Sequence, residues 1–219
     1  MNLPYPLLSD WLYTLAWLLW LPAVGWALWR ADWRFLTRDN HSHVWAATLV
    51  ALALMWSLKA GVKPGLELHL TGAMLLTLLS GAPLAFLGLN VVLAAIFVNQ
   101  GIAWPAFAIN ALMTAGIGVL IAQGIHRLVN HCFKPHFFIT IFLKAFFGSG
   151  LAVFGIGLGF CLLYALTGIY SWTYLSGDYL PYYLLLGFSE AWLTGIVFTL
   201  LMVYYPGTIA TFDDAIYSR

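Results

Sequence analysis

The sequence predicts an all-α fold, a polytopic transmembrane helical bundle that forms a single domain over residues 1–219. Two observations of composition carry this prediction: 63% of the 219 residues are hydrophobic, and only 8% are charged. Such a composition lies far outside the range of soluble globular proteins. Nine basic and eight acidic side chains are too few to solvate the surface of a soluble domain of this size. The lipid bilayer is therefore expected to be the main solvent.

Apolar stretches about as long as a membrane span, roughly 17 to 25 residues, recur along the chain. The expected spans are residues 11–29, 44–58, 68–81, 83–99, 104–125, 137–167 and 182–204, about seven in all. The third and fourth are short, and only the turn Gly81-Ala82-Pro83 separates them. One kinked or re-entrant element is therefore an alternative to two separate spans.

The sixth expected span is too long for one upright crossing, and its glycines suggest two roles. The run Gly148-Ser149-Gly150 could break or tilt this helix. The run 155–159 has glycine at every second position and would let a neighbouring helix approach closely.

Basic residues at the ends of the spans indicate the orientation. Five of them fill the first and fifth loops, which lie on the same side of a seven-span bundle: Arg30, Arg34, Arg38, Arg127 and Lys134. Because Lys and Arg accumulate in cytoplasmic loops, we expect the N-terminus outside and the C-terminus in the cytoplasm. Lys59 and Lys63 lie in the second loop, on the opposite side, and argue against this orientation.

Several classes of function find no support in the sequence. The net charge of +1 provides no basic face for nucleic acid. The chain contains no nucleophile elbow, P-loop, HExxH or paired-carboxylate motif, so we expect neither an enzyme nor an intrinsic ATPase. Cys132 and Cys161 match no zinc spacing and are expected to be buried apolar residues.

The informative residues are polar groups that a bilayer makes costly to bury. His69 opens the third expected span on the external side, the same side as Met1, and is either a metal ligand or an ordinary helix-end histidine. Glu190 lies about 12 Å into the last span and needs a partner or a proton. Lys144 lies about as deep from the other side and is expected to snorkel to the interface. Asn110 is expected either to contact substrate or to bond a neighbouring helix.

Five histidines fall on the expected cytoplasmic side, in the first and fifth loops: His41, His43, His126, His131 and His136. Their spacing matches no structural zinc pattern, and no paired Cys or acidic ligand set beyond Asp39 accompanies them. We therefore expect solvated loops, and a membrane metalloenzyme is a remote alternative.

Three segments together resemble the CbiM/NikM-type substrate-capture permeases of energy-coupling-factor transporters for cobalt and nickel. They are LHLTGA at 68–73, INALM at 109–113 and GFSEAWLTG at 187–195. Their order and spacing are similar to that family over roughly residues 65 to 206. The resemblance implies a seven-span fold with an external N-terminus.

The resemblance also implies a metal site. In that family the metal is held by the N-terminal amine, by a histidine at residue 2 and by the histidine of the His-Leu-x-Gly-Ala block, which is His69 here. Met1 and His69 carry over as ligands, whereas residue 2 is Asn2 and offers its amide nitrogen or its carboxamide oxygen. The family's Gly-Asp-Gly-Gly segment is also changed, to Asn99-Gln100-Gly101-Ile102. Square-planar nitrogen donors select Ni(II), Cu(II) or Co(II).

These implications lead to a functional hypothesis with one alternative. The chain would be the substrate-binding subunit of an importer in a bacterial inner membrane, with a divalent transition metal ion as substrate and no intrinsic cofactor. It would dock on a transmembrane coupling protein and ATPase subunits through loops 30–43 and 125–136. Asn110 and Glu190 would belong to the substrate-binding site. The alternative is an accessory or assembly subunit that has kept the permease fold and lost the metal site with residue 2.

Overall fold

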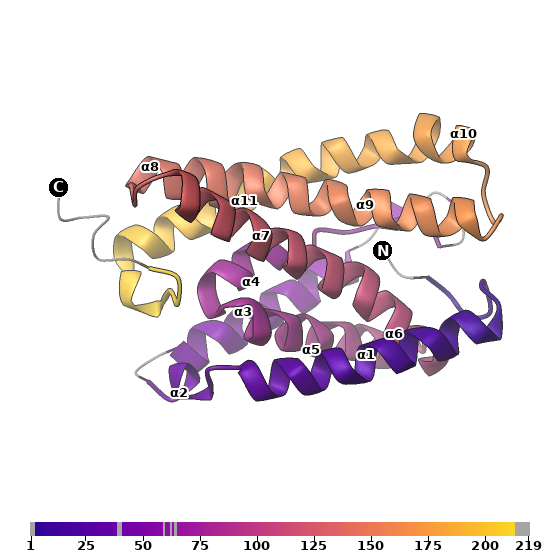
Figure 1. Ribbon diagram of the computed structural model, residues 1–219, viewed down its shortest axis with the longest axis horizontal. Coiled ribbons are helices and arrows are strands. Elements are labelled where there is room, and N and C mark those ends of the chain that lie inside the picture. The colour runs from indigo at the N-terminus through magenta and orange to yellow at the C-terminus, as the bar shows by residue number, and fades with distance from the viewer. Residues whose placement is uncertain (1–2, 39–40, 59, 62, 64, 213–219) are drawn as a thin grey trace.

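The computed structural model describes residues 3–38, 41–58, 60–61, 63 and 65–212. Within this part of the chain, five helices are long and apolar enough to cross a membrane: Asp10–Arg30, Ala82–Gln100, Trp104–Cys132, Phe137–Leu166 and Trp172–Tyr204. They run along the long axis of an elongated bundle (Figure 1). The expectation of a polytopic helical membrane protein is confirmed.

The N-terminal segment is followed by helix α1 (Asp10–Arg30), the short helix α2 (Trp33–Leu36) and helix α3 (His41–Ser57). The 17 residues of α3 extend about 25 Å, close to the thickness of a hydrocarbon core. Helix α1 is fixed to α5 (Ala82–Gln100) by a side-chain hydrogen bond, since Trp20 Nε1 donates to Asn90 Oδ1 over 2.7 Å.

The third expected span is only half helical. Strand β2 (Glu67–Leu68), which pairs with β1 (Ala60–Gly61), leads into a non-helical stretch, and helix α4 covers only Ala73–Ser80. Eight residues of helix extend about 12 Å, which is less than half the thickness of a hydrocarbon core. At Gly81, with φ 79° and ψ 159°, the chain reverses into α5, and Leu76 of α4 then packs against Gly88 of α5.

Three long helices complete the bundle, and each contains a π-helical stretch. Helix α6 (Phe107–Asn110) follows the turn η1 (Trp104–Ala106) and continues through η2 (Ala111–Gly116) into α7 (Ile117–Cys132). Helix α8 (Phe137–Ile139) continues through η3 (Thr140–Phe147) into α9 (Gly148–Leu166). Helix α10 (Trp172–Tyr174) continues through η4 (Leu175–Tyr179) into α11 (Leu180–Tyr204), and η5 (Pro206–Thr208) follows it.

The glycines of the sixth expected span pack against neighbouring helices and do not break it, because the helix runs unbroken over Phe137–Leu166. At Gly150, α9 approaches α11 so closely that a Cβ on Gly187 would lie 3.0 Å from the Gly150 carbonyl oxygen. At Gly157, the ring of Tyr183 fills the space of the missing side chain, 2.3 Å from where a Cβ would stand. The predicted close approach is confirmed.

Three expectations about individual side chains are wrong. His41 is only 8% exposed, and its ring stacks on that of Phe35. Its two ring nitrogens lie 2.9 Å from the Phe35 carbonyl oxygen and 2.5 Å from the Gly207 carbonyl oxygen. His41 therefore joins the first loop to the chain that follows α11. Lys144 is only 6% exposed and does not snorkel. Cys132 is exposed, whereas Cys161 is buried as expected.

Loop charge is distributed unevenly between the two ends of the bundle. Figure 1 places α2, the start of α8 and the chain after α11 at one end, so Arg30, Arg34 and Lys134 gather there. Lys63 lies at the other end, with its Nζ 3.9 Å from the centre of the Tyr174 ring. Lys59 lies outside the described residues.

We expect Gly157→Ala to lower the thermal unfolding temperature of the detergent-purified protein. The new methyl group would overlap the buried Tyr183 ring, and such overpacking costs roughly 1–3 kcal/mol. The matched control is Gly124→Ala on α7, where nothing lies within 4 Å of the added carbon. Equal melting temperatures for the two variants would contradict the packing described here.

Candidate metal-binding site

The N-terminal segment enters the bundle and is held there by Asn110. Leu3 is fully buried, and its backbone N–H donates to Asn110 Oδ1 over 2.7 Å. Asn110 Nδ2 donates in turn to the Leu3 carbonyl over 2.9 Å and to the Ala106 carbonyl over 2.8 Å. The carboxamide thus pairs with Leu3 as a neighbouring strand would. Asn110 lies directly before η2, and π-helical turns in long helices are frequent at functional sites.

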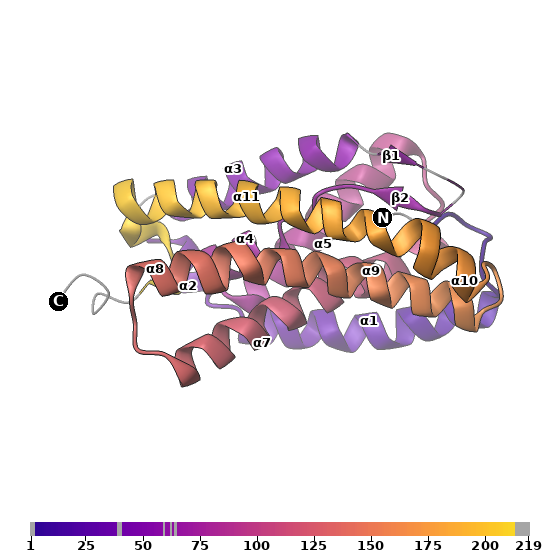
Figure 2. The ribbon, with the colours of Figure 1, turned by 90° about the horizontal axis from the view of Figure 1, so that it is seen from above.

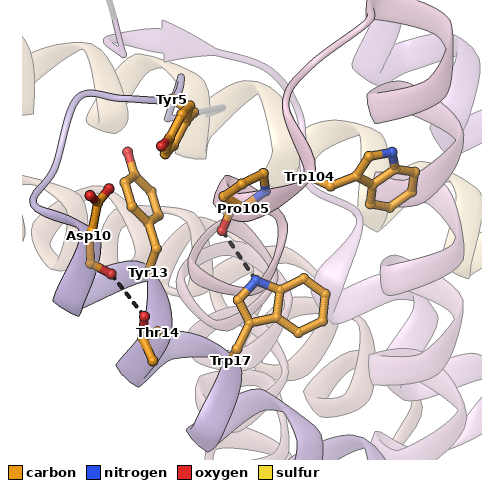
Figure 3. Close-up of a pocket in the computed structure, with 7 residues that line it drawn as sticks. All are labelled: Tyr5, Asp10, Tyr13, Thr14, Trp17, Trp104 and Pro105. Carbon is orange, nitrogen blue, oxygen red and sulfur yellow. Dashed lines mark hydrogen bonds between the residues drawn. The ribbon is translucent and has the colours of Figure 1, made fainter.

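Tyr13 of α1 makes a second attachment for this segment. Its hydroxyl accepts a hydrogen bond from the Leu8 N–H over 3.1 Å and donates to the Pro4 carbonyl over 3.3 Å. Figure 3 shows the Tyr13 side chain pointing toward Tyr5, and their ring centres lie 5.2 Å apart. These rings line a cavity of about 420 Å³ together with Asp10, Thr14, Trp17, Trp104 and Pro105.

His69 lies in the non-helical stretch between β2 and α4. It is 2% exposed, and its ring centre is 4.5 Å from that of Trp56. Its Nδ1 lies 3.0 Å from the Leu70 carbonyl oxygen, and donation to this oxygen leaves the lone pair of the neutral ring on Nε2, as in most metal-binding histidines. Trp56 Nε1 donates to the Thr71 carbonyl over 3.3 Å and so also fixes the stretch.

Glu190 holds the end of this stretch from the opposite side of the bundle. The Thr71 N–H donates to Oε2 over 2.6 Å, and the Thr71 hydroxyl and the Gly72 N–H donate to Oε1 over 2.6 and 2.8 Å. Glu190 is 1% exposed. Its carboxylate therefore stands at the N-terminus of α4, where helical N–H groups lack partners and the helix dipole favours negative charge.

Glycines allow the backbone of this stretch to pack closely. Gly72 has φ +68°, and a Cβ there would lie 2.2 Å from a methyl carbon of Leu52. Gly65 has φ +78°, and a Cβ there would lie 2.9 Å from Leu7 and 3.5 Å from Pro4. The N-terminal segment therefore packs on the turn at Gly65, which precedes β2 and lies four residues before His69.

Sequence reasoning missed the side chains that hold these two segments. Besides Tyr13 and Trp56, the Tyr164 hydroxyl donates to the Gly65 carbonyl over 2.7 Å, and the Tyr179 and Tyr183 hydroxyls lie 2.9 Å apart. A usable signal existed, because a phenol or indole inside an apolar helix needs a hydrogen-bond partner when it is buried. The partners of Tyr13, Trp56 and Tyr164 are backbone groups, which have no sequence signature.

Of the remaining candidates, those that the structure describes do not form a metal centre with these residues. Met1, Asn2 and Asp39 lie outside the described residues. Within the described ranges, no group of three or more His, Cys, Asp or Glu side chains is placed to hold a metal ion. His43, His131 and His136 are exposed, and His126 Nε2 pairs with Asn130 Nδ2 over 3.1 Å. Asn99 is exposed at the end of α5.

Two solved structures share this fold. One, described as a truncated transition metal transporter, has a TM-score of 0.79 at 17% identity and covers 93% of this chain and 99% of its own. The other, described as a transition metal transporter, has a TM-score of 0.76 at 18% identity and covers 93% of each chain. A search of curated protein sequences finds no match.

The sequence itself matches a family of membrane proteins. The match covers residues 2–208, almost the whole chain. It includes all three segments on which the resemblance rests and both residues, Asn110 and Glu190, that hold the candidate site. The chain belongs to the CbiM family, described as the cobalt uptake substrate-specific transmembrane region.

Proposed function

We propose that this protein is the substrate-capture subunit of an energy-coupling-factor importer and that its substrate is a divalent transition metal ion such as Ni, Co or Cu. Membership of a cobalt uptake family and the shared fold of two transition metal transporters support this proposal. The observation that carries it is that Asn110 holds the N-terminal segment inside the bundle, where this segment packs against Gly65, four residues before the buried His69. The role is transport and not catalysis.

The ligands in this proposal are the Met1 amine, the backbone nitrogen of Asn2 and the imidazole of His69. Leu3 is the first described residue, and it is buried and bonded on both its N–H and its carbonyl. Asn2, directly before it, retains a backbone amide that can act as an in-plane ligand when deprotonated. Its carboxamide oxygen replaces an imidazole, so the metal is held less tightly than with histidine.

Asn110 and Glu190 belong to the proposed binding site as positioning residues. Asn110 fixes the backbone of Leu3, the neighbour of Asn2, and Glu190 fixes the backbone of Thr71, two residues after His69. A metal site needs ligands held within a fraction of an ångström. Each ligand-bearing segment therefore has its own hydrogen-bonded support.

The proposed topology has about seven crossings, with the N-terminus outside and the C-terminus in the cytoplasm of a bacterium. The five long apolar helices give five crossings, and α3 and the combination of extended chain with α4 give two more. The basic residues at the end of α1 and near α8 support this orientation. The loops at that end, residues 30–43 and 125–136, are the proposed docking surfaces for a transmembrane coupling protein and its ATPases.

Metal titration tests the proposed substrate class. Protein with a native N-terminus is expected to bind about one Ni(II), Co(II) or Cu(II) per chain, as measured by calorimetry and elemental analysis, and His69→Ala is expected to abolish binding. The control is His43→Ala, which removes an exposed imidazole near the start of α3, at the opposite end of this helix from Trp56 and His69. Metal binding that survives His69→Ala would contradict the proposed ligand set.

Asn2→His separates the proposed function from its alternative, an accessory subunit without a working metal site. Asn2 is the observation that favours this alternative. If the native chain binds no metal and Asn2→His gains a site, the fold has kept the supports and lost the ligand, and the accessory role follows. If the native chain binds metal and Asn2→His strengthens this binding by about tenfold or more, the result supports metal capture.

Glu190→Ala should destabilise the fold by roughly 2–5 kcal/mol, because it leaves the Thr71 and Gly72 N–H groups and the Thr71 hydroxyl without their buried acceptor. Hydrogen exchange at the amides of residues 71–73 should rise well before global unfolding. Ser189→Ala provides the control, since this neighbouring hydroxyl is exposed and bonds only within its own helix. Unchanged exchange at these amides would contradict the supporting role of Glu190.

A further inference from the structure

A groove opens on the surface between the second half of α1 and the middle and end of α7, away from the candidate metal site. Its volume is about 530 Å³, and its floor is the first turns of α5, including Phe86. Helix α7 is inclined to α9 and ends away from it, near the end of the bundle where α8 begins (Figure 2). Helices α1 and α7, which form the walls of the groove, lie apart at that end of the bundle in Figure 1.

The polar end of the groove carries two guanidinium groups. Arg30, the last residue of α1, and Arg127, one turn before the end of α7, both line it. Gln123 lies one turn before Arg127 on the same face and adds an amide. Neither arginine forms an ion pair within the described chain, and no carboxylate lines the groove there. The Arg30 guanidinium lies 5.9 Å from the centre of the Trp29 ring. The lining at this end of the groove is therefore positively charged, with no acidic side chain to neutralise it.

The rest of the groove is apolar and lies at membrane depth. Along η2 and α7 its lining runs from Leu112 to Arg127, a rise of about 22 Å along a helix and more than half of a hydrocarbon core of roughly 30 Å. Trp26 and Leu120 at its sides are 54% and 74% exposed, so the groove is continuous with the lipid-facing surface. Its length is sufficient for one acyl chain from headgroup to bilayer centre.

We infer that this groove binds one anionic phospholipid. The phosphodiester of the headgroup lies between Arg30 and Arg127, because a guanidinium pairs with phosphate oxygens through two parallel hydrogen bonds. One acyl chain follows the apolar lining toward Gly116. Basic pockets between transmembrane helices on the cytoplasmic side favour anionic headgroups. The placement of this lipid in the cytoplasmic leaflet rests on the proposed orientation.

Native mass spectrometry of the full detergent-purified chain tests the charge requirement. With phosphatidylglycerol and phosphatidylcholine of identical acyl chains, one phosphatidylglycerol should remain bound, and Arg30→Gln with Arg127→Gln should weaken its retention by about tenfold or more. Arg34→Gln with Arg38→Gln is the matched control, because these exposed arginines do not line the groove. Equal retention of the two lipids, or an unaffected arginine variant, would overturn the assignment.

A second pair of variants tests the acyl-chain path without changing charge. Gly116→Phe should fill the groove and expel the lipid, since only atoms of its own helix lie within 4 Å of an added Cβ. Gly124→Phe places the same ring on α7 outside the groove and should leave lipid retention unchanged. If soluble glycerol phosphate displaces the lipid at equal concentration, the site recognises an anion only and the lipid assignment fails. The assignment fails equally if the Gly116→Phe variant retains the lipid.

Discussion

The structure depends on satisfying the backbone of the non-helical stretch between β2 and α4, which is buried in the bundle. The N–H groups of such a stretch need acceptors from the protein, because buried backbone groups cannot bond water. Glu190, from the middle of another helix, supplies the acceptors for Thr71 and Gly72, and its charge suits the positive end of α4. This carboxylate thus satisfies the backbone at the end of the stretch that carries His69. The glycine contacts at Gly150 and Gly157 hold α11 against α9 and so keep Glu190 in place.

The N-terminal segment solves a similar problem in another way. A non-helical chain entering the bundle leaves backbone groups without helical partners, and the Asn110 carboxamide pairs with both groups of Leu3. The Tyr13 hydroxyl pairs with the Pro4 carbonyl and the Leu8 N–H. Both non-helical segments are thus held by side chains from remote helices, and the N-terminal one packs on the turn at Gly65 that precedes β2. A site built from non-helical chain in this way can present backbone nitrogen to a ligand, which an intact helix cannot, because its N–H groups are bonded.

The sequence was sufficient for those features that depend on hydropathy or on the cost of burying charge. The long helices follow from apolar length, and Glu190 stood out because a carboxylate deep in a span needs a partner. The half-helical third span was visible only as a short apolar stretch, since the partner of its broken end lies 119 residues away. The predictions for His41, Lys144 and Cys132 are wrong because burial depends on tertiary packing: His41 contacts the chain after α11, Lys144 lies inside η3, and Cys132 ends α7 at the surface. The pairing of Asn110 with Leu3 joins a side chain to a backbone, and no residue pattern encodes a backbone partner.

The lipid groove and the candidate metal site are connected through α1. This helix follows the N-terminal segment directly and holds it through Tyr13, yet few of its own side chains are buried: Tyr13, Ala16 and Ala27. The Trp20 to Asn90 hydrogen bond fixes its middle, while its second half borders the groove and lies apart from α7. An acyl chain in the groove would supply the dispersion contacts that a void forfeits and would tie Arg30 to α7 through a shared phosphate. The anionic lipid would then stabilise the position of the helix from which the N-terminal segment is held.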